Sequence, residues 1–99
     1  MWIEEPLDAY DHEGHAALAA QFDTPIATGE MLTSAAEHAD LIRHRAADYL
    51  MPDAPRLGGI TPFLKVAAQA DQAGLMLGPH FAMELHVHLG AAYPREPWV

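Results

Sequence analysis

The sequence predicts an α/β fold in which about four strand–helix units with parallel strands form the C-terminal half of a (β/α)8 TIM-type barrel. Short, wholly apolar strands recur along the chain, which is typical of strands covered on both faces of a parallel sheet. Segments with helical composition, about 10–15 residues long, separate them. An ionisable residue follows each strand. A complete barrel needs about 200–250 residues and the chain has 99, so we expect residues 1–99 to form a single partial barrel domain.

The composition excludes several classes of protein. Half of the residues are apolar (51%) and the mean hydropathy is −0.04, as in a globular protein. Five Lys and Arg against 14 Asp and Glu give a net charge of −9, which argues against nucleic acid or an anionic membrane as partner. The absence of cysteine excludes disulfides and thiolate metal sites. The chain has neither a membrane-helix-like apolar run nor a signal peptide, and we expect it in the cytoplasm.

The first strand–helix unit begins at residues 2–3. Pro6 ends this strand because proline has no N–H to donate to a sheet. A helix is expected over residues 13–22, where alanine, a strong helix former, recurs. The second strand is expected over residues 24–27.

The second helix has a capping signal at its start. Ser34 can act as N-cap, and Glu37 stands at capping-box distance from it. The helix is expected to run to about Arg45, with Leu41 and Ile42 on its inner face.

The third unit has a strand at residues 49–51 and a helix that ends before Gly74. Thr61 followed by Pro62 predicts the N-cap and first residue of this helix. We expect its apolar side to consist of Ile60, Phe63, Leu64, Ala67, Ala68 and Ala70.

The fourth unit has a strand at residues 75–77 and a helix from about Ala82 to Ala92. Pro94 interrupts the chain beyond this helix. Trp98 and Val99 are expected to begin a fifth strand.

Four ionisable residues stand just after the four expected strands, namely Glu4, Glu30, Asp53 and His80. They are separated by 26, 23 and 27 residues, about one strand–helix unit each. In a (β/α) barrel, residues at the carboxyl ends of the strands meet at one mouth and build the active site. The alternative is that all four are solvated loop residues, because loops are generally polar.

Two histidine motifs have a metal-binding and a structural interpretation. His12 and His15 could form a metal pair, but no third ligand is near in sequence, and we expect surface histidines in a polar loop. In the segment Glu84–His88, Glu84 and His88 share a helix face while His86 points elsewhere, so a structural or rim role is expected rather than a three-ligand site.

Three further features have more than one interpretation. Gly58 and Gly59 precede a helix and could hold a phosphate, but tight turn geometry explains them equally well. Arg56 could contact a substrate carboxylate or pair with a local acid, and both remain open. Four methionines are expected in the core or lining a pocket, namely Met31, Met51, Met76 and Met83.

The same strand ends carry a resemblance to a known family. The motifs are Trp2–Pro6, Thr28–Glu30, Met51–Asp53, Gly58–Thr61 and Pro79–His80. They resemble the barrel domain of the enolase superfamily, mandelate racemase/muconate lactonizing branch, and in particular its acid-sugar dehydratases. The resemblance extends over essentially all 99 residues.

The resemblance implies a Mg²⁺-dependent enzyme that removes the proton α to a carboxylate, stabilises the enediolate on Mg²⁺ and then eliminates water from galactarate- or talarate-like acid sugars. Glu4 and Glu30 would be metal ligands. His80 would be the general base and acid, and Asp53 would orient its imidazole. Glu5 is expected on the opposite strand face and not as a ligand. The resemblance also implies a homo-oligomer.

Other parts of the family's site have no counterpart here. A third metal carboxylate, a lysine pair and the capping domain would precede Met1, and a further glutamate would follow Val99. We therefore expect the isolated chain to be an inactive fragment of such a dehydratase. The alternatives are a truncated half-barrel that only self-associates through its open strand edges, and a fragment of a racemase or epimerase of the same superfamily.

Overall fold

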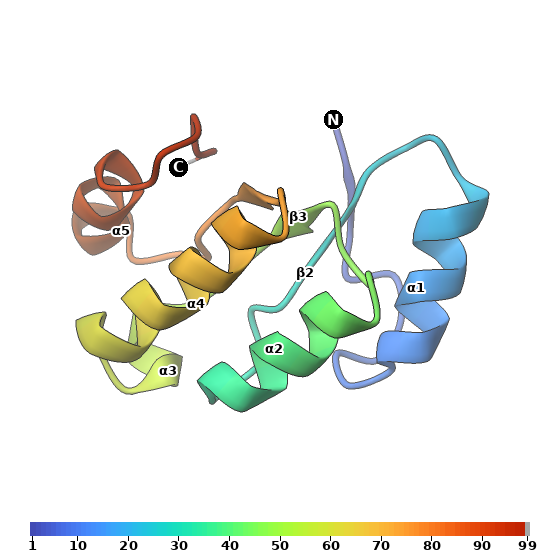
Figure 1. Ribbon diagram of the computed structural model, residues 1–99, viewed down its shortest axis with the longest axis horizontal. Helices are drawn as coiled ribbons and strands as arrows, with labels where there is room; N and C mark the ends of the chain where they lie inside the picture. Colours follow the sequence, from blue (N-terminus) through green and yellow to red (C-terminus); the bar gives the residue numbers. More distant parts are fainter. Residues whose placement is uncertain (99) are drawn as a thin grey trace.

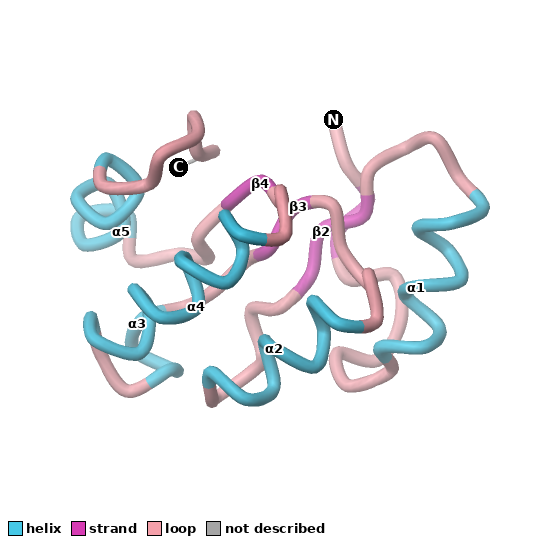
Figure 2. Tube along the Cα trace, viewed as in Figure 1, coloured by secondary structure: helices cyan, strands magenta, loops and turns pink. Residues whose placement is uncertain are grey.

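The computed structural model describes residues 1–98, which form an α/β fold with a parallel sheet (Figures 1 and 2). The strand order is β1-β2-β3-β4, so each strand pairs with the next along the chain. The strands are β1 (Ile3–Glu4), β2 (Ile26–Thr28), β3 (Tyr49–Leu50) and β4 (Met76–Leu77). The helices are α1 (His12–Gln21), α2 (Ala35–Arg43), α3 (Ala54–Leu57), α4 (Ile60–Gln72) and α5 (Met83–Ala91). The predicted α/β class with parallel strands is confirmed.

The core lies where the helices that follow β2 and β3 pack against the strands (Figure 1). The residues that fill it are wholly buried aliphatic and aromatic side chains: Leu32, Leu41, Leu50, Phe63, Val66 and Leu77. Because the core is on the helix side of the short strands, the residues just after each strand stay available at the carboxyl edge of the sheet.

Helix α2 begins as predicted. The Ser34 hydroxyl accepts a hydrogen bond from the Glu37 N–H at 3.1 Å, and the Glu37 carboxylate accepts one from the Thr33 N–H at 2.7 Å. The backbone hydrogen bond from Thr33 is the main reason that the pKa of Glu37 is lowered. The helix ends at Arg43, two residues before the expected end, and Arg45 adopts a left-handed φ of 55°.

The start of α4 differs from the prediction. The helix begins at Ile60 with Gly59 as its N-cap, and no side chain caps it, so Thr61 is not the N-cap. The sequence before it forms the short helix α3, which was not predicted, and which ends at Gly58 in a left-handed conformation (φ 92°). Gly59 has φ 127°, and a residue with a side chain is strained at such a value. The glycine pair therefore makes the tight turn between two helices.

The buried face of α4 agrees with the expected apolar side at Phe63, Ala67 and Ala70, and Val66 is an addition to it. Phe63, Val66, Ala67 and Ala70 are buried, at the i, i+3, i+4, i+7 spacing of one helix face. The remaining members of the expected apolar side are exposed, namely Ile60, Leu64 and Ala68.

The expected fifth strand lies partly outside the described residues, since Val99 is not among them. The Trp98 N–H donates to the Leu77 carbonyl oxygen at 2.9 Å, so the chain comes back alongside β4 at this point. No helix in the described part of the chain is long and apolar enough to span a membrane.

His86 has the structural role expected for the Glu84–His88 segment. It is wholly buried in α5, and its ring stacks on that of Phe63 with centroids 5.5 Å apart. Its Nε2 accepts from the Ala54 N–H at 3.1 Å, and its Nδ1–H donates to the Phe81 carbonyl at 2.6 Å. The neutral imidazole therefore joins α5 to the first residue of α3.

Replacement of His86 by leucine is expected to lower the free energy of unfolding by about 1–3 kcal/mol, because the buried Ala54 N–H loses its partner. The Phe81 carbonyl also loses its partner but is only partly buried. Urea denaturation followed by circular dichroism measures the change. His88→Leu on the exposed side of the same helix is the control. Equal stability of the two variants would contradict this role.

Candidate functional site

The four residues singled out at the strand ends all lie at the carboxyl edge of the parallel sheet. Glu4 is the last residue of β1, and Glu30 follows β2 by two positions. Asp53 and His80 each follow their strand, β3 or β4, by three positions. Because the strands are parallel and in sequential order, these ends point the same way. The four residues thus have the placement that the spacing predicts.

His80 joins two of the other three residues. Its Nδ1 is 3.0 Å from Oδ2 of Asp53, and its Nε2 is 3.5 Å from Oε2 of Glu30. The imidazole is about one-quarter exposed, while the Asp53 side chain is only 7% exposed. An ionised carboxylate only accepts hydrogen bonds, so Nδ1 carries the proton that faces Asp53. The other ring nitrogen, Nε2, faces Glu30 and the solvent.

Asp53 is held in place by the backbone of α3. It is the N-cap of that helix, and its Oδ1 accepts a hydrogen bond from the Arg56 N–H at 2.9 Å. Burial raises the pKa of Asp53, but the hydrogen bonds from His80 and the Arg56 N–H outweigh it and hold the pKa below its ordinary value. The short helix α3 therefore fixes one carboxylate oxygen and leaves the other for His80.

Arg56 pairs with the local acid, one of the two roles left open by the sequence. Its Nε is 3.8 Å from Oδ2 of Asp53, and its Nη1 contacts the Met31 sulfur at 3.1 Å. The guanidinium side chain is 41% exposed, so the attraction is screened and contributes little to stability.

Glu4 stands apart from the His80 contacts. Its side chain is exposed, and its Oε2 accepts a hydrogen bond from Trp2 Nε1 at 2.9 Å. Within residues 1–98, no hydrogen bond or ion pair joins it to Glu30, Asp53 or His80. Glu4 and His80 nevertheless line one cavity of about 320 Å³, together with Met51 and Met83. Two of the four methionines expected in the core or around a pocket therefore line this one.

Glu5 belongs to the same group of carboxylates, although strand alternation predicts that it faces away. Strand β1 ends at Glu4, and Glu5 turns the chain with a left-handed φ of 38°. Its Oε2 is buried and has no hydrogen-bond partner. Burial raises the pKa of Glu5, and the negative charges of Glu30 and Glu4 raise it further. The doubled glutamate before a proline is the sequence signal that could have indicated this turn.

The donor set at this edge fits a hard divalent cation. Burial is the main reason that the pKa of Glu5 is raised, and the charges of Glu30 and Glu4 add to it; a bound cation would offset this added repulsion. Carboxylate oxygens are the ligands that Mg²⁺ prefers, with water and substrate oxygens in its remaining positions. Among the described residues, Glu4 and Glu30 are not part of a group of three converging ligands. They can therefore supply only part of a coordination shell.

The expectation that His12 and His15 are surface histidines in a polar loop is wrong. Both lie in α1 and are buried, His15 completely. His12 Nδ1 is 3.0 Å from Oδ2 of Asp40 in α2. The partner is 28 residues away in sequence, so the local pattern did not predict it.

The whole chain, residues 1–99, matches the protein family described as Enolase C-terminal domain-like. The chain is 67% identical to L-talarate/galactarate dehydratase of Salmonella typhimurium over 99 residues, which is all of this chain and 25% of that protein. The solved structure of L-talarate dehydratase from Polaromonas sp. JS666 with Mg and L-glucarate is 90% identical, with a TM-score of 0.97 over 99% of this chain and 27% of that one.

A second similar structure is a racemase from Streptomyces coelicolor A3(2) with bound magnesium. It is 33% identical, with a TM-score of 0.93 over 98% of this chain and 29% of that one. The chain thus spans about a quarter of the length of the relatives it matches.

Proposed function

The chain belongs to the Enolase C-terminal domain-like family, in the mandelate racemase/muconate lactonizing branch of the enolase superfamily, and on that premise we propose that it forms part of the active site of a Mg²⁺-dependent acid-sugar dehydratase. The observation that carries the proposal is the contact of His80 with both Asp53 and Glu30 at the strand ends. The similarity to dehydratases of L-talarate and galactarate supports a six-carbon dicarboxylic acid sugar as substrate.

His80 acts as the general base in this proposal. Its Nδ1–H is held by Asp53, and in the neutral ring the lone pair of Nε2 accepts the proton from the carbon α to a substrate carboxylate. The resulting imidazolium is stabilised by the Asp53 and Glu30 carboxylates. It then returns the proton to the β-hydroxyl, which leaves as water while the α,β double bond forms.

Glu4 and Glu30 would hold the metal ion. When bound, Mg²⁺ stabilises the negative charge that develops on the substrate carboxylate as the α-proton leaves. Because Glu30 also contacts His80, it places the base next to the charged end of the substrate. The cavity beside Glu4 and His80 is the space that the sugar chain would enter.

The activity is proposed for a longer protein in which residues 1–99 are a partial barrel domain. The single lysine, Lys65, is exposed on α4, so we propose that a lysine acid–base partner comes from outside these residues, as does a third metal carboxylate of the kind that the family resemblance implies. Catalytic groups that act as a unit lose their effect together when one is missing, and we therefore expect no turnover by the 99-residue chain alone.

A chimera tests the proposal. Residues 1–99 replace the matching quarter of the Salmonella typhimurium L-talarate/galactarate dehydratase, and dehydration of L-talarate and galactarate is assayed with and without Mg²⁺. We expect turnover within about tenfold of the parent enzyme, since the residues that contact the substrate are retained, and loss of turnover after chelation. A folded chimera without turnover would contradict the proposal, as would turnover by the isolated chain.

A racemase or epimerase is the second candidate, favoured by the 33% identical racemase structure. A base such as His80 can return the proton to carbon instead of to a leaving hydroxyl. The same chimera distinguishes the two, because a racemase yields an epimer that has gained deuterium from heavy water, whereas a dehydratase yields a product one water lighter.

A further inference from the structure

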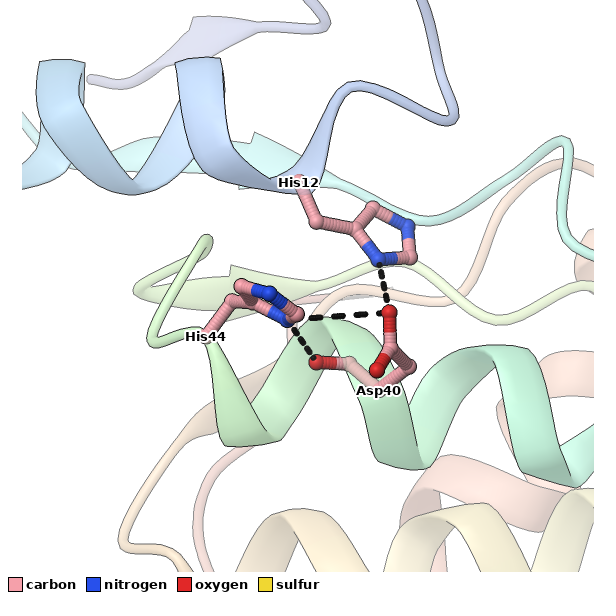
Figure 3. A group of neighbouring side chains, drawn as sticks. All are labelled: His12, Asp40 and His44. Atoms are coloured by element: carbon pink, nitrogen blue, oxygen red, sulfur yellow. Dashed lines mark hydrogen bonds and ion pairs between the residues drawn. The ribbon is translucent and has the colours of Figure 1, made fainter.

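Three metal-ligating side chains from two helices converge at a place remote from the strand ends (Figure 3). His12 is the first residue of α1, and Asp40 and His44 stand one turn apart at the end of α2. One ligand atom of each lies within 4.8 Å of those of the other two. Among residues 1–98, no other three histidine or acidic side chains meet this condition.

Both imidazoles turn a nitrogen toward the same carboxylate oxygen. Oδ2 of Asp40 is 3.0 Å from Nδ1 of His12 and 3.6 Å from Nδ1 of His44. A tetrahedral Zn²⁺ with bonds of about 2.0–2.2 Å keeps its ligand atoms about 3.3 Å apart. The distances from Oδ2 of Asp40 to the two nitrogens are therefore close to those around such an ion. Nδ1 of His44 also donates a hydrogen bond to the backbone carbonyl oxygen of Asp40 at 2.8 Å, a bond that gives way when the nitrogen takes an ion.

The surroundings leave room for an ion with its water. His12 is 8% exposed, and its Nε2 has no hydrogen-bond partner. Oδ2 of Asp40 is the carboxylate oxygen that faces the two imidazoles. Arg43 pairs with the other oxygen, Oδ1, and its side chain is 75% exposed, so solvent screens its charge. A cavity of about 330 Å³ opens beside the cluster and is also lined by Asp11, Glu13 and Tyr10.

We propose that His12, Asp40 and His44 bind a first-row transition-metal ion such as Zn²⁺, which fastens α1 to α2. Imidazole nitrogen suits Zn²⁺, Co²⁺, Ni²⁺ and Cu²⁺, whereas Mg²⁺ prefers oxygen ligands. The site is therefore chemically different from the glutamate group at the strand ends. A bound ion would also stabilise the packing of α1 against α2. The buried residues of α1 are His12 and His15, so this helix has no large buried apolar side chain to hold it in place.

The test uses Zn²⁺ as the probe. The purified protein, freed of metal by chelation, is titrated with Zn²⁺ in a calorimeter in excess Mg²⁺, at a pH about one unit above the ordinary imidazole pKa of about 6.5. We expect one saturable site that Mg²⁺ does not occupy. Removal of a ligand with His44→Gln should weaken binding by at least about tenfold. The matched control is His88→Gln, a histidine exposed on α5, which should bind as the unaltered protein does.

A second variant and a spectroscopic measurement separate binding from folding. His12→Gln removes the ligand that α1 contributes and should weaken binding as His44→Gln does, while circular dichroism shows whether each variant keeps its helices. Co²⁺ in place of Zn²⁺ should give the visible absorption of a tetrahedral ion, lost in both variants. Absence of saturable binding, displacement by Mg²⁺, or equal affinity in His44→Gln and His88→Gln would overturn the proposal.

Discussion

Replacing His80 by glutamine is expected to lower the turnover of the chimeric dehydratase by about 10²–10⁴-fold, the usual contribution of a positioned general base. Glutamine has about the same polarity and can still donate a hydrogen bond to Asp53, but its amide nitrogen has no basic lone pair. The proton α to the carboxylate then has no acceptor at this position. The measurement is kcat for L-talarate at saturating Mg²⁺, with circular dichroism to compare the folds.

The control for this prediction is His88→Gln, which removes an exposed imidazole on α5 and should leave kcat unchanged. Because His80 is about one-quarter exposed, its replacement creates no large cavity, and we expect little change in stability. If the His80 variant kept more than about a tenth of the activity, its general-base role would be wrong.

The sequence predicted the sheet well because its signals are local. Each strand is a short apolar segment, and breakers such as Pro6 and Gly74 lie close to where elements end. The start of α4 was predicted wrongly because two signals compete there. Asp53 is the N-cap of the short helix α3, which precedes α4. Gly59, with its positive φ, is the N-cap of α4, so the helix begins at Ile60 and Thr61 and Pro62 already lie inside it.

The candidate site was predicted for a different reason, namely the repeat of the fold. A parallel sheet with its strands in chain order brings residues one strand–helix unit apart to the same edge, so spacing alone placed Glu30, Asp53 and His80 together. The same logic could not predict the His12–Asp40 contact, because it joins two helices rather than two strand ends. The repeat also could not predict the position of the Glu5 side chain. Side chains alternate between the two faces only within a strand, and the chain turns at Glu5.

The second large effect is expected for Asp53→Asn, which should leave stability almost unchanged and still lower turnover by about 10²–10⁴-fold. Asparagine is as good an N-cap as aspartate, so its carbonyl oxygen can take over the hydrogen bond that Oδ1 accepts from the Arg56 N–H. The amide NH₂ then faces Nδ1 of His80, where Oδ2 was.

An NH₂ group donates and cannot accept, so Nδ1 of His80 must accept from it and the ring proton moves to Nε2. The nitrogen that faces Glu30 and the substrate side then carries a hydrogen, and it cannot remove the α-proton.

Asp53→Ala is the informative comparison, because it removes the cap and should cost about 1 kcal/mol of stability, yet it leaves His80 free to adopt either tautomer. The alanine variant should therefore be the less stable and the more active of the two, as measured by urea denaturation and kcat. If activity instead followed stability across the two variants, Asp53 would matter to catalysis only through the fold of α3, and not through the proton that it holds on Nδ1 of His80.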